Sequence, residues 1–573
     1  MNMIKAETCE KGPVIPTTPL VIFLEKVQET ALQVYGHKGF DPKQFVDMSL
    51  RQNLEATVEA FDKIPRTVND SVLKNDLDGF IGKYLGGADE DLVYVEPVDY
   101  VAEPEGFLPK VKNTEVRAWA LEVHSLWKNL SRKVSDHVLE KPELYTLLPL
   151  KNPVIIPGSR FREVYYWDSY WMIRGLLASK MYETAKGVVT NLISLIDQFG
   201  YVLNGARAYY IAIHIFSQPP VLAAMIVDIY NRTGDLDLVR RCLPALLKEH
   251  HFWNSGIHIV TIQDAQGSTH SLSRYYAMWN KPRPESSTID RRTASKLPNI
   301  CEKREFYRDL ASAAESGWDF SSRWMRNESD LATTTTTSII PVDLNAFLLK
   351  MELDIAFLAN LIGESSVVTQ FTEASQNRQR AMNCILWNAE MGQWLDYWLD
   401  SSNKSEDIYK WEDLHQNKKS FASNFVPLWT QLFSSVVDDI TTQRVIQSLR
   451  RLGLLQSAGI AMTLSNTGQQ WDFPNGWPPL QHMIIEGLAR SGLEEARTLA
   501  KDIAIRWIRT NYVAYKKTGA MYEKYDVTRC GAAGGGGVYV AQTGFGWTNG
   551  VVLALLEEFG WPEDLNIDCC SIK

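Results

Sequence analysis

The segment from Leu344 to Leu358, LNAFLLKMELDIAFL, decides the fold class of this 573-residue chain. Its apolar residues recur at intervals of three and four positions, at Leu344, Phe347, Leu348, Met351, Ile355 and Leu358. That spacing places them along one face of an α-helix. We therefore predict a long helix that packs through an apolar stripe.

A second helical pattern further along the chain has the form of a hairpin. Its apolar residues run from Ile484 to Leu488, stop before Gly492 and resume from Ala496 to Trp507. A last helix is predicted over Asn549 to Phe559, and Gly560 directly after it is a usual helix-stop signal. Helical hairpins of this kind favour an all-α protein.

Runs that alternate apolar and polar residues are scarce, so a parallel sheet or a sandwich has little support. Many helix pairs suggest a solenoid or a closed toroid of helical hairpins, and the lack of a fixed-period repeat favours the toroid. The biased stretches at Thr333 to Thr337 and Gly534 to Gly537 are too short to act as linkers. We predict one domain over residues 1–573, with a less regular amino-terminal portion at about 1–150.

Composition excludes some functions and leaves others open. The net charge of −9, without a cluster of Lys and Arg, argues against a nucleic-acid surface. The 18 Trp and 23 Tyr suit a protein that covers the apolar faces of sugar rings, although a large helical core also absorbs Trp as packing. Composition alone favours the packing interpretation.

The cysteines and histidines do not have the spacing of a metal centre. The seven Cys include no C-x-x-C pair, and the ten His include no H-E-x-x-H pattern. We predict neither a disulfide framework nor a zinc site, and no metal or other cofactor.

The amino-terminal apolar run, Pro13 to Leu24, is too short to span a membrane and lacks the features of a signal peptide. The default expectation is a soluble cytoplasmic protein. Five N-x-[ST] sequons keep a secreted history open. They start at Asn69, Asn129, Asn231, Asn327 and Asn403.

Four segments gather charged, aromatic, Gly and Pro residues outside the regular helical pattern. They are PGSRFREVYYWDSYW from Pro157 to Trp171, GQQWDFPNGWPP from Gly468 to Pro479, ESGWDF from Glu315 to Phe320, and EKYD from Glu523 to Asp526 with GGGGVY from Gly534 to Tyr539. Charged groups bond sugar hydroxyls while rings cover apolar sugar faces. Each segment alone is equally explained as helix-cap and loop chemistry, but the four together favour a carbohydrate site.

The segments Pro157 to Trp171 and Gln470 to Pro479 resemble the two signatures of the trehalase family, and the resemblance extends from about Gly12 to the end. The serine in Pro157-Gly-Ser-Arg160 is most similar to plant members. This resemblance implies an (α/α)₆ barrel that hydrolyses trehalose with inversion of configuration. It also keeps an extracellular or apoplastic location possible.

The resemblance assigns roles residue by residue. Asp319 falls at the general acid and Glu523 at the general base, and inversion places such carboxyl groups about 6.5–9.5 Å apart. Trp318 and Phe320 would keep Asp319 protonated by excluding water. The positions that match substrate-binding residues are Arg160, Trp167, Asp168, Asn204, Gln218, Arg283, Glu285 and Gly317.

Two departures from the family pattern weaken the expectation of activity. Val538 stands where trehalases have Glu, and Phe216 stands in place of an arginine within an altered loop at 211–216. We reason that the missing carboxylate would either accept a hydrogen bond from a sugar hydroxyl or hold an arginine such as Arg160 or Arg283, which its loss would leave unpaired. Three hypotheses follow: an active trehalase, a weakened paralogue that binds trehalose, and a related glycosidase for another disaccharide. The oligomeric state is not predicted.

Overall fold

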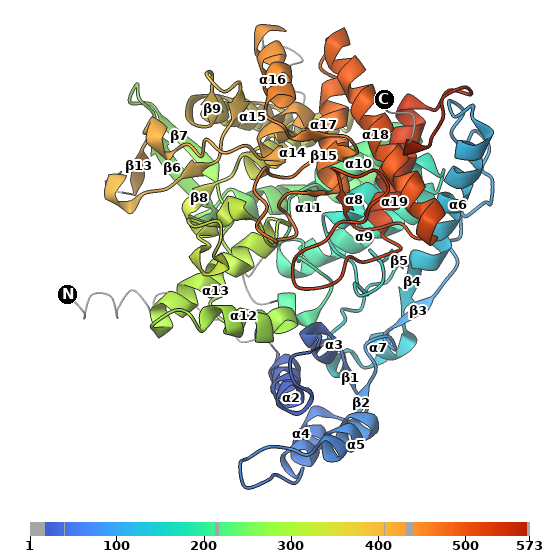
Figure 1. Cartoon of the computed structure of the whole chain (residues 1–573), viewed down its shortest axis with the longest axis vertical. Helices are drawn as coiled ribbons and strands as arrows, with labels where there is room; N and C mark the ends of the chain where they lie inside the picture. The colour runs from blue at the N-terminus through green and yellow to red at the C-terminus, as the bar shows by residue number, and fades with distance from the viewer. Residues whose placement is uncertain (1–17, 39, 212–216, 406, 431–438, 570–573) are drawn as a thin grey trace.

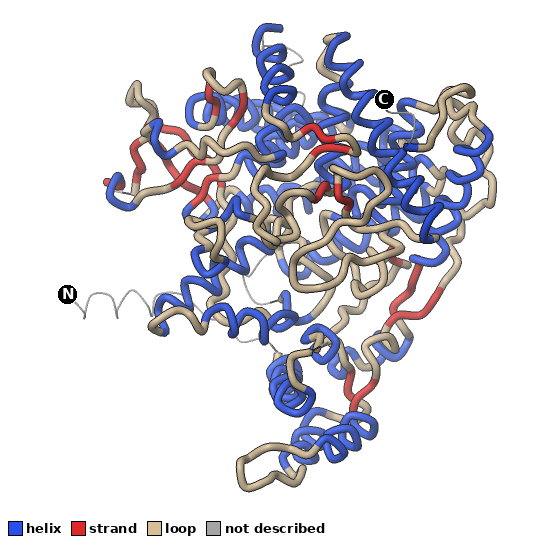
Figure 2. The backbone as a smooth tube through the Cα atoms, in the orientation of Figure 1, coloured by secondary structure: helices blue, strands red, loops and turns tan. Residues whose placement is uncertain are grey.

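The computed structural model describes residues 18–38, 40–211, 217–405, 407–430 and 439–569. Helices make up most of this part of the chain, and the strands are short and scattered between them (Figure 2). The predicted all-α class is confirmed.

Within the described residues, six helical segments form a closed inner ring. Each packs against the next, and the last packs against the first. They are α8 (Asp168–Ala178), α10 (Leu222–Thr233), α14 (Val342–Leu361), the 3₁₀ helix η10 (Ala422–Thr430), α17 (Pro478–Ala489) and α19 (Gly546–Phe559).

A second layer of helices covers this ring on the outside. α9 packs on α8, α11 on α10, α15 on α14, α18 on α17 and α6 on α19. The outer helices are α6 (Thr114–Leu130), α9 (Tyr182–Phe199), α11 (Leu236–Trp253), α15 (Ser365–Ile385), α16 (Asp439–Arg451) and α18 (Glu494–Thr518). The fold is an (α/α)₆ barrel, as predicted, and the predicted hairpin is the pair α17 and α18.

The helix predicted over Leu344 to Leu358 is α14, and it is more deeply buried than one apolar stripe requires. Polar residues on its other faces are buried as well, including Asp343 and Glu352. An inner-ring helix has neighbours on nearly every side, so these groups need internal partners. Arg323 pairs with Asp343 and Arg378 pairs with Glu352.

The first helices of the amino-terminal portion, over residues 19–84, lie at the lower end of the molecule in Figure 1, in blue, and its later strands run upward on the right side. Gln28 of α2 donates hydrogen bonds of 2.8 Å to the carbonyl oxygens of Pro42 and Pro284, which fastens this portion to the barrel. Its elements are α2 (Pro19–Tyr35), α3 (Pro42–Val46), β1 (Ser49–Leu50), α4 (Leu54–Asp62), α5 (Lys74–Tyr84), β2 (Leu85–Gly86), β3 (Leu92–Tyr94), β4 (Ser131–Val134), α7 (Asp136–Glu140) and β5 (Val154–Ile155).

A small sheet with strand order β12-β13-β6-β7 projects from the barrel at the left of Figure 1. Its strands are β6 (Ile259–Gln263), β7 (Thr269–Ser273), β12 (Lys404–Ser405) and β13 (Ile408–Lys410), and β6 pairs with β7 as an antiparallel hairpin. The remaining helices are α12 (Ser287–Ala294) and α13 (Ile300–Glu315), and the remaining strands are β8 (Ile339–Ile340), β9 (Trp387–Asn388), β10 (Gln393–Trp394), β11 (Tyr397–Trp398), β14 (Leu455–Gln456), β15 (Gly459–Ile460), β16 (Asn475–Gly476) and β17 (Tyr525–Asp526).

Cys301 is disulfide-bonded, and a disulfide bond joins Cys530 to Cys569, with their Cα atoms 6.0 Å apart. The prediction that the cysteines form no disulfide framework was wrong at these residues, including the pair Cys530 and Cys569. The residues are 39 positions apart, and their approach depends on how the carboxyl-terminal segment folds back over the barrel. Among the described residues, every helix is too short or too polar to cross a membrane.

Candidate active site

A cavity of about 530 Å³ lies at the amino-terminal ends of the inner helices. Asp168 begins α8, Gln218 shortly precedes α10, and Trp477 directly precedes α17. All ten residues singled out from the sequence line this cavity: Arg160, Trp167, Asp168, Asn204, Gln218, Arg283, Glu285, Gly317, Asp319 and Glu523. The barrel thus gathers segments from both halves of the chain into one site.

Arg160 lies in the cavity wall with its guanidinium group held by Asp41. Its Nε and Nη2 atoms each donate a hydrogen bond of 2.7 Å to the Asp41 carboxylate. The ring of Tyr539 packs 5.3 Å from the guanidinium carbon. A bidentate ion pair of this kind fixes the orientation of the cation.

Trp167 is positioned by backbone and side-chain contacts at the start of α8. Its backbone N–H donates to Oε1 of Gln218 at 3.0 Å, and its ring lies against Gly317. Gly317 has φ +76°, and a Cβ atom there would lie 2.5 Å from the Trp167 ring. Both the backbone conformation and the close approach therefore require glycine. Asn204 lines the same region, and its Nδ2 donates to the carbonyl oxygen of Ser217 at 3.1 Å.

Arg283 is buried and paired with Asp290. Its Nη2 donates to Oδ1 of Asp290 at 2.9 Å, and its Nε donates to Oδ2 at 3.1 Å. The guanidinium carbon lies 5.0 Å from the ring centre of Phe320. Glu285 is two residues away in η4 (Pro284–Ser286), and burial raises the pKa of its carboxyl group. One of its carboxyl oxygens, Oε2, is buried without a hydrogen-bond partner in the described residues.

Asp319 follows the end of α13 and faces the cavity. Burial raises the pKa of its carboxyl group to about 7, with the cation of Arg283 opposing the rise and the carboxylate of Glu285 adding to it. Its backbone carbonyl oxygen accepts a hydrogen bond from Nε2 of Gln470. A carboxyl group with this pKa is substantially protonated near neutral pH and can donate a proton.

Glu523 lies between α18 and β17 and is almost fully buried. Nζ of Lys524 donates to its Oε1 at 2.8 Å, and the hydroxyl of Tyr539 donates to its Oε2 at 3.4 Å. Burial raises the pKa of Glu523, while the Lys524 cation and these hydrogen bonds oppose that rise. Lys524 also donates to Oε1 of Gln470 at 2.9 Å, so Gln470 connects the neighbourhoods of the two carboxyl groups.

Asp168 supplies a further carboxyl group, beside those of Glu285, Asp319 and Glu523. Burial raises its pKa to about 8, and the charges of Glu523 and Asp319 add to the rise. These four carboxyl groups share one cavity and cannot all ionise easily at neutral pH, so the cavity holds both protonated and ionised acids. With aromatic rings and paired arginines around them, these groups suit acid–base hydrolysis of a neutral carbohydrate.

Sequence comparison decides the family. Residues 38–560 match the trehalase family model. The chain belongs to the trehalase family. A probable trehalase from Oryza sativa is 56% identical over 97% of this chain and 99% of its own length, and a trehalase from Arabidopsis thaliana is 54% identical over 98% of this chain and 89% of its own.

More distant trehalases are also similar to this chain over most of its length. Homo sapiens trehalase is 39% identical over 91% of this chain and 86% of its own length. The structure of neutral trehalase from Saccharomyces cerevisiae aligns with a TM-score of 0.56 and 27% identity, over 71% of this chain and 73% of that chain. The expected resemblance to plant trehalases is confirmed by these identities.

Aromatic residues of the trehalase signatures form a stacked layer under the cavity. The rings of Trp471 and Trp477 are parallel, with centres 4.2 Å apart, and Trp318 stacks on Trp471 at 5.0 Å. Trp167 lies 5.9 Å from Trp471. The abundant Trp therefore fits both interpretations drawn from composition. The rings of Trp167, Trp471 and Trp477 line the cavity, whereas Trp318 packs against Trp471 and is not part of the lining.

Some charged residues of the signatures are structural. Glu163 is fully buried and pairs with Nζ of Lys43 at 2.5 Å. Asp472 accepts hydrogen bonds from the hydroxyl of Ser321 at 2.7 Å and from the backbone N–H of Ser322 at 2.9 Å, which fixes the segment that follows Asp319. These two carboxylates do not line the cavity, and they hold neighbouring segments of the site in place.

Several site residues were missed by the sequence assignment. Asp41, Gln470 and Tyr539 line the cavity, and Lys524 contacts Glu523 directly. Gln470 begins one of the two signature segments, and Asp41 lies within the stretch from about Gly12 onward over which the resemblance extends, so these were the available signals. The pairing of Asp41 with Arg160 could not be read from a separation of 119 residues.

Of the two departures from the trehalase pattern, the described residues include only Val538. Val538 lines the cavity from the glycine-rich segment and is 50% exposed. The argument that its loss of charge leaves Arg160 or Arg283 unpaired was wrong, because Asp41 and Asp290 hold these arginines. Phe216 lies outside the described residues.

Proposed function

We propose that the chain hydrolyses trehalose to two glucose molecules with inversion at one anomeric carbon. The observation that carries this proposal is the cavity that gathers Asp319 and Glu523 with the matched sugar-binding residues in a member of the trehalase family. Asp319 protonates the glycosidic oxygen, and Glu523 removes a proton from the attacking water. The oxygen of that water bonds to the anomeric carbon as the bond to the leaving glucose breaks.

The environments of the two carboxyl groups support this division of roles. Asp319 has a pKa of about 7 and keeps its proton for donation near neutral pH. Lys524 favours the ionised form of Glu523, which is the form a general base needs. Side chains perform both proton transfers, so the reaction requires no cofactor.

We assign binding of the two glucose units to Arg160, Trp167, Asp168, Asn204, Gln218, Arg283, Glu285 and Gly317. Trp167 covers an apolar sugar face, and the fixed guanidinium groups of Arg160 and Arg283 donate to hydroxyls. Glu285 supports this role because its buried Oε2 has an acceptor position that a sugar hydroxyl can fill. Gly317 lets the backbone approach closely at the Trp167 wall.

The test is glucose release by the purified full chain. Trehalose, maltose and glucose 1-phosphate are supplied at equal concentration, and Asp319→Asn and Glu523→Gln serve as matched inactive variants. We expect glucose from trehalose alone and almost none from either variant. Trehalose binding without turnover would instead support the weakened paralogue, and turnover of another substrate in preference would support a related glycosidase.

The chain acts, in this proposal, as one catalytic domain. A continuous apolar core runs from Leu20 to Ile567 and joins the amino-terminal portion to the barrel.

We also propose that the chain acts in an oxidising compartment. The disulfide bond between Cys530 and Cys569 is typical of secreted and extracellular proteins. Mass spectrometry of the protein purified from its own tissue, without reductant, tests for the bond, and free thiols at both residues would contradict the assignment.

A further inference from the structure

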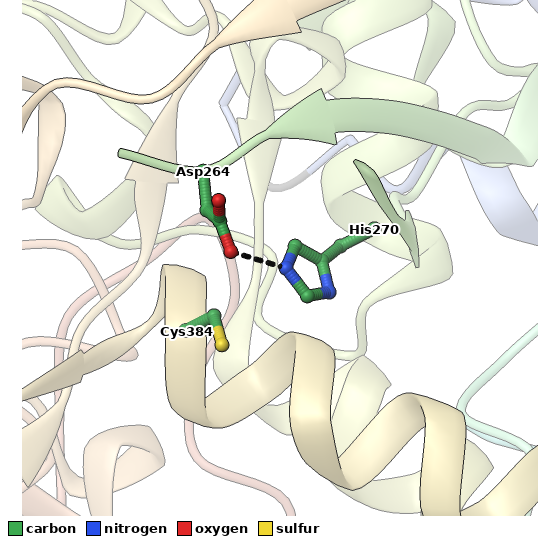
Figure 3. Close-up of side chains that lie close together, drawn as sticks. All are labelled: Asp264, His270 and Cys384. Carbon is green, nitrogen blue, oxygen red and sulfur yellow. Dashed lines mark hydrogen bonds and ion pairs between the residues drawn. The ribbon is translucent and has the colours of Figure 1, made fainter. Parts of the chain in front are cut away.

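Three potential metal ligands from separate elements meet beside the small sheet (Figure 3), and none of them lines the catalytic cavity. Asp264 follows β6, His270 lies in β7 and Cys384 lies in the last turn of α15. One donor atom from each residue, a carboxylate oxygen, a ring nitrogen and the thiol sulfur, lies within 4.8 Å of the other two. Figure 3 shows the carboxylate facing the imidazole with the thiol beside it.

The hairpin turn holds Asp264 in place. Its Oδ1 accepts hydrogen bonds from the backbone N–H groups of Gln266 at 3.0 Å and Ser268 at 2.8 Å. Its Oδ2 is 2.7 Å from Nε2 of His270. The side chains of Asp264 and His270 are 6% and 12% exposed, so two donors are fixed and largely shielded from water. Cys384 is exposed and can change rotamer toward them.

We propose that Asp264, His270 and Cys384 bind one divalent cation of the zinc class. The combination of thiolate, imidazole and carboxylate suits a borderline-soft ion and does not suit Mg²⁺ or Ca²⁺. In a tetrahedral site with bonds of about 2.0–2.3 Å, the ligand atoms lie about 3.5 Å apart. The ion therefore enters between Asp264 and His270, and the sulfur of Cys384 closes on it.

Binding of the metal ion requires two of the three ligands to give up a proton. The Cys384 thiol gives its proton to solvent and coordinates as a thiolate. The proton that Nε2 of His270 shares with Asp264 is lost to solvent, and Nε2 coordinates while the neutral ring holds its one proton on Nδ1. Water completes the fourth position. The ion then joins the β6–β7 hairpin to the end of α15, which already packs on β7. Since these residues do not line the catalytic cavity, the ion stabilises the fold and leaves trehalose turnover unchanged.

The experiment uses the full chain, dialysed against a chelator and kept without reductant so that the disulfide stays intact. Co²⁺ is titrated as a spectroscopic probe, and Zn²⁺ binding is measured by calorimetry. We expect one site, a thiolate-to-cobalt charge-transfer band in the near ultraviolet and a higher melting temperature with Zn²⁺. Cys384→Ser should abolish the band, and Cys384→Ser and His270→Gln should each weaken Zn²⁺ binding at least about 10-fold.

Two variants serve as matched controls. Cys242→Ser changes the buried free cysteine of α11, and His37→Gln changes an exposed histidine near α2. Both should keep the charge-transfer band and the Zn²⁺ affinity. The proposal is overturned if the wild-type chain gives no charge-transfer band, or if Cys384→Ser binds Zn²⁺ as tightly as the wild type.

Discussion

Nζ of Lys524 lies 2.8 Å from Oε1 of Glu523, and both side chains are fully or almost fully buried. A buried cation this close stabilises the carboxylate against protonation, in opposition to the burial that raises the pKa of Glu523. Lys524 is therefore a positioning residue that limits the rise in the pKa of the proposed base.

Replacing Lys524 by Met should move the acidic limb of the kcat/KM profile to higher pH by about one to three units. Without the cation the pKa of Glu523 rises, so the base becomes protonated at a pH where the wild type is active. A pH series of initial rates measures the shift. Lys517→Met, at an exposed position of α18, is the control and should leave the profile unchanged. An unshifted acidic limb in Lys524→Met would show that the lysine only fills space.

The basic limb of the same profile should reflect Asp319. The acid works only when protonated, so activity should fall as pH rises through the pKa of about 7. Asp319→Asn should lower kcat by a factor of about 10²–10⁴. It should also remove the basic limb from the residual activity while calorimetry still detects trehalose binding. Persistence of the basic limb in this variant would assign that limb to another group, with Asp168 as the first candidate.

Gly317→Ala should weaken substrate binding by displacing Trp167. A left-handed backbone at a residue other than glycine costs about 1–2 kcal/mol, and the close contact with the Trp167 ring adds about 1–3 kcal/mol. Gly519→Ala is the matched control, because Gly519 has φ +71° and open space around its Cβ position. We expect a lower melting temperature in both variants and a raised KM for trehalose only in Gly317→Ala. Equal KM values would contradict a role for the Gly317 contact.

Val538→Glu should raise kcat/KM only modestly. Both nearby arginines already have carboxylate partners, so a new carboxylate gains one hydrogen bond to a sugar hydroxyl, worth about 0.5–1.5 kcal/mol or roughly 2- to 12-fold in rate. Val98→Glu, at an exposed position that does not line the cavity, is the control and should give no gain. A gain above this range would show that a cation in the cavity lacks its partner. No gain at all would show that position 538 contributes less than the family pattern implies.

The fold and much of the site could be predicted because their signals are local or shared with a family. The period of Leu344 to Leu358 reports burial, and Gly560 marks a helix end, since both effects act between neighbours in the chain. The four charged and aromatic segments identified the site in the same way. What the sequence could not reveal depends on tertiary approach, such as Arg160 meeting Asp41 and Cys530 meeting Cys569.

The contact between Lys524 and Glu523 could not be predicted either, although the two residues are adjacent in the sequence. Adjacent side chains of an extended segment usually point apart. Only the turn between α18 and β17 brings both side chains to the same buried space. The expectation that Val538 leaves an arginine unpaired was wrong for a related reason. The fold brings Asp41 to Arg160 and Asp290 to Arg283, so neither arginine depends on a carboxylate at position 538.

The central claim is that Asp319 and Glu523 act as acid and base in an inverting hydrolysis of trehalose. Proton NMR of the anomeric protons during the first minutes of reaction tests it most directly, before the glucose anomers equilibrate. The account predicts α-glucose and β-glucose in equal initial amounts, with glucose formation nearly abolished in Asp319→Asn and Glu523→Gln. Early release of α-glucose alone, or undiminished turnover in either variant, would contradict it.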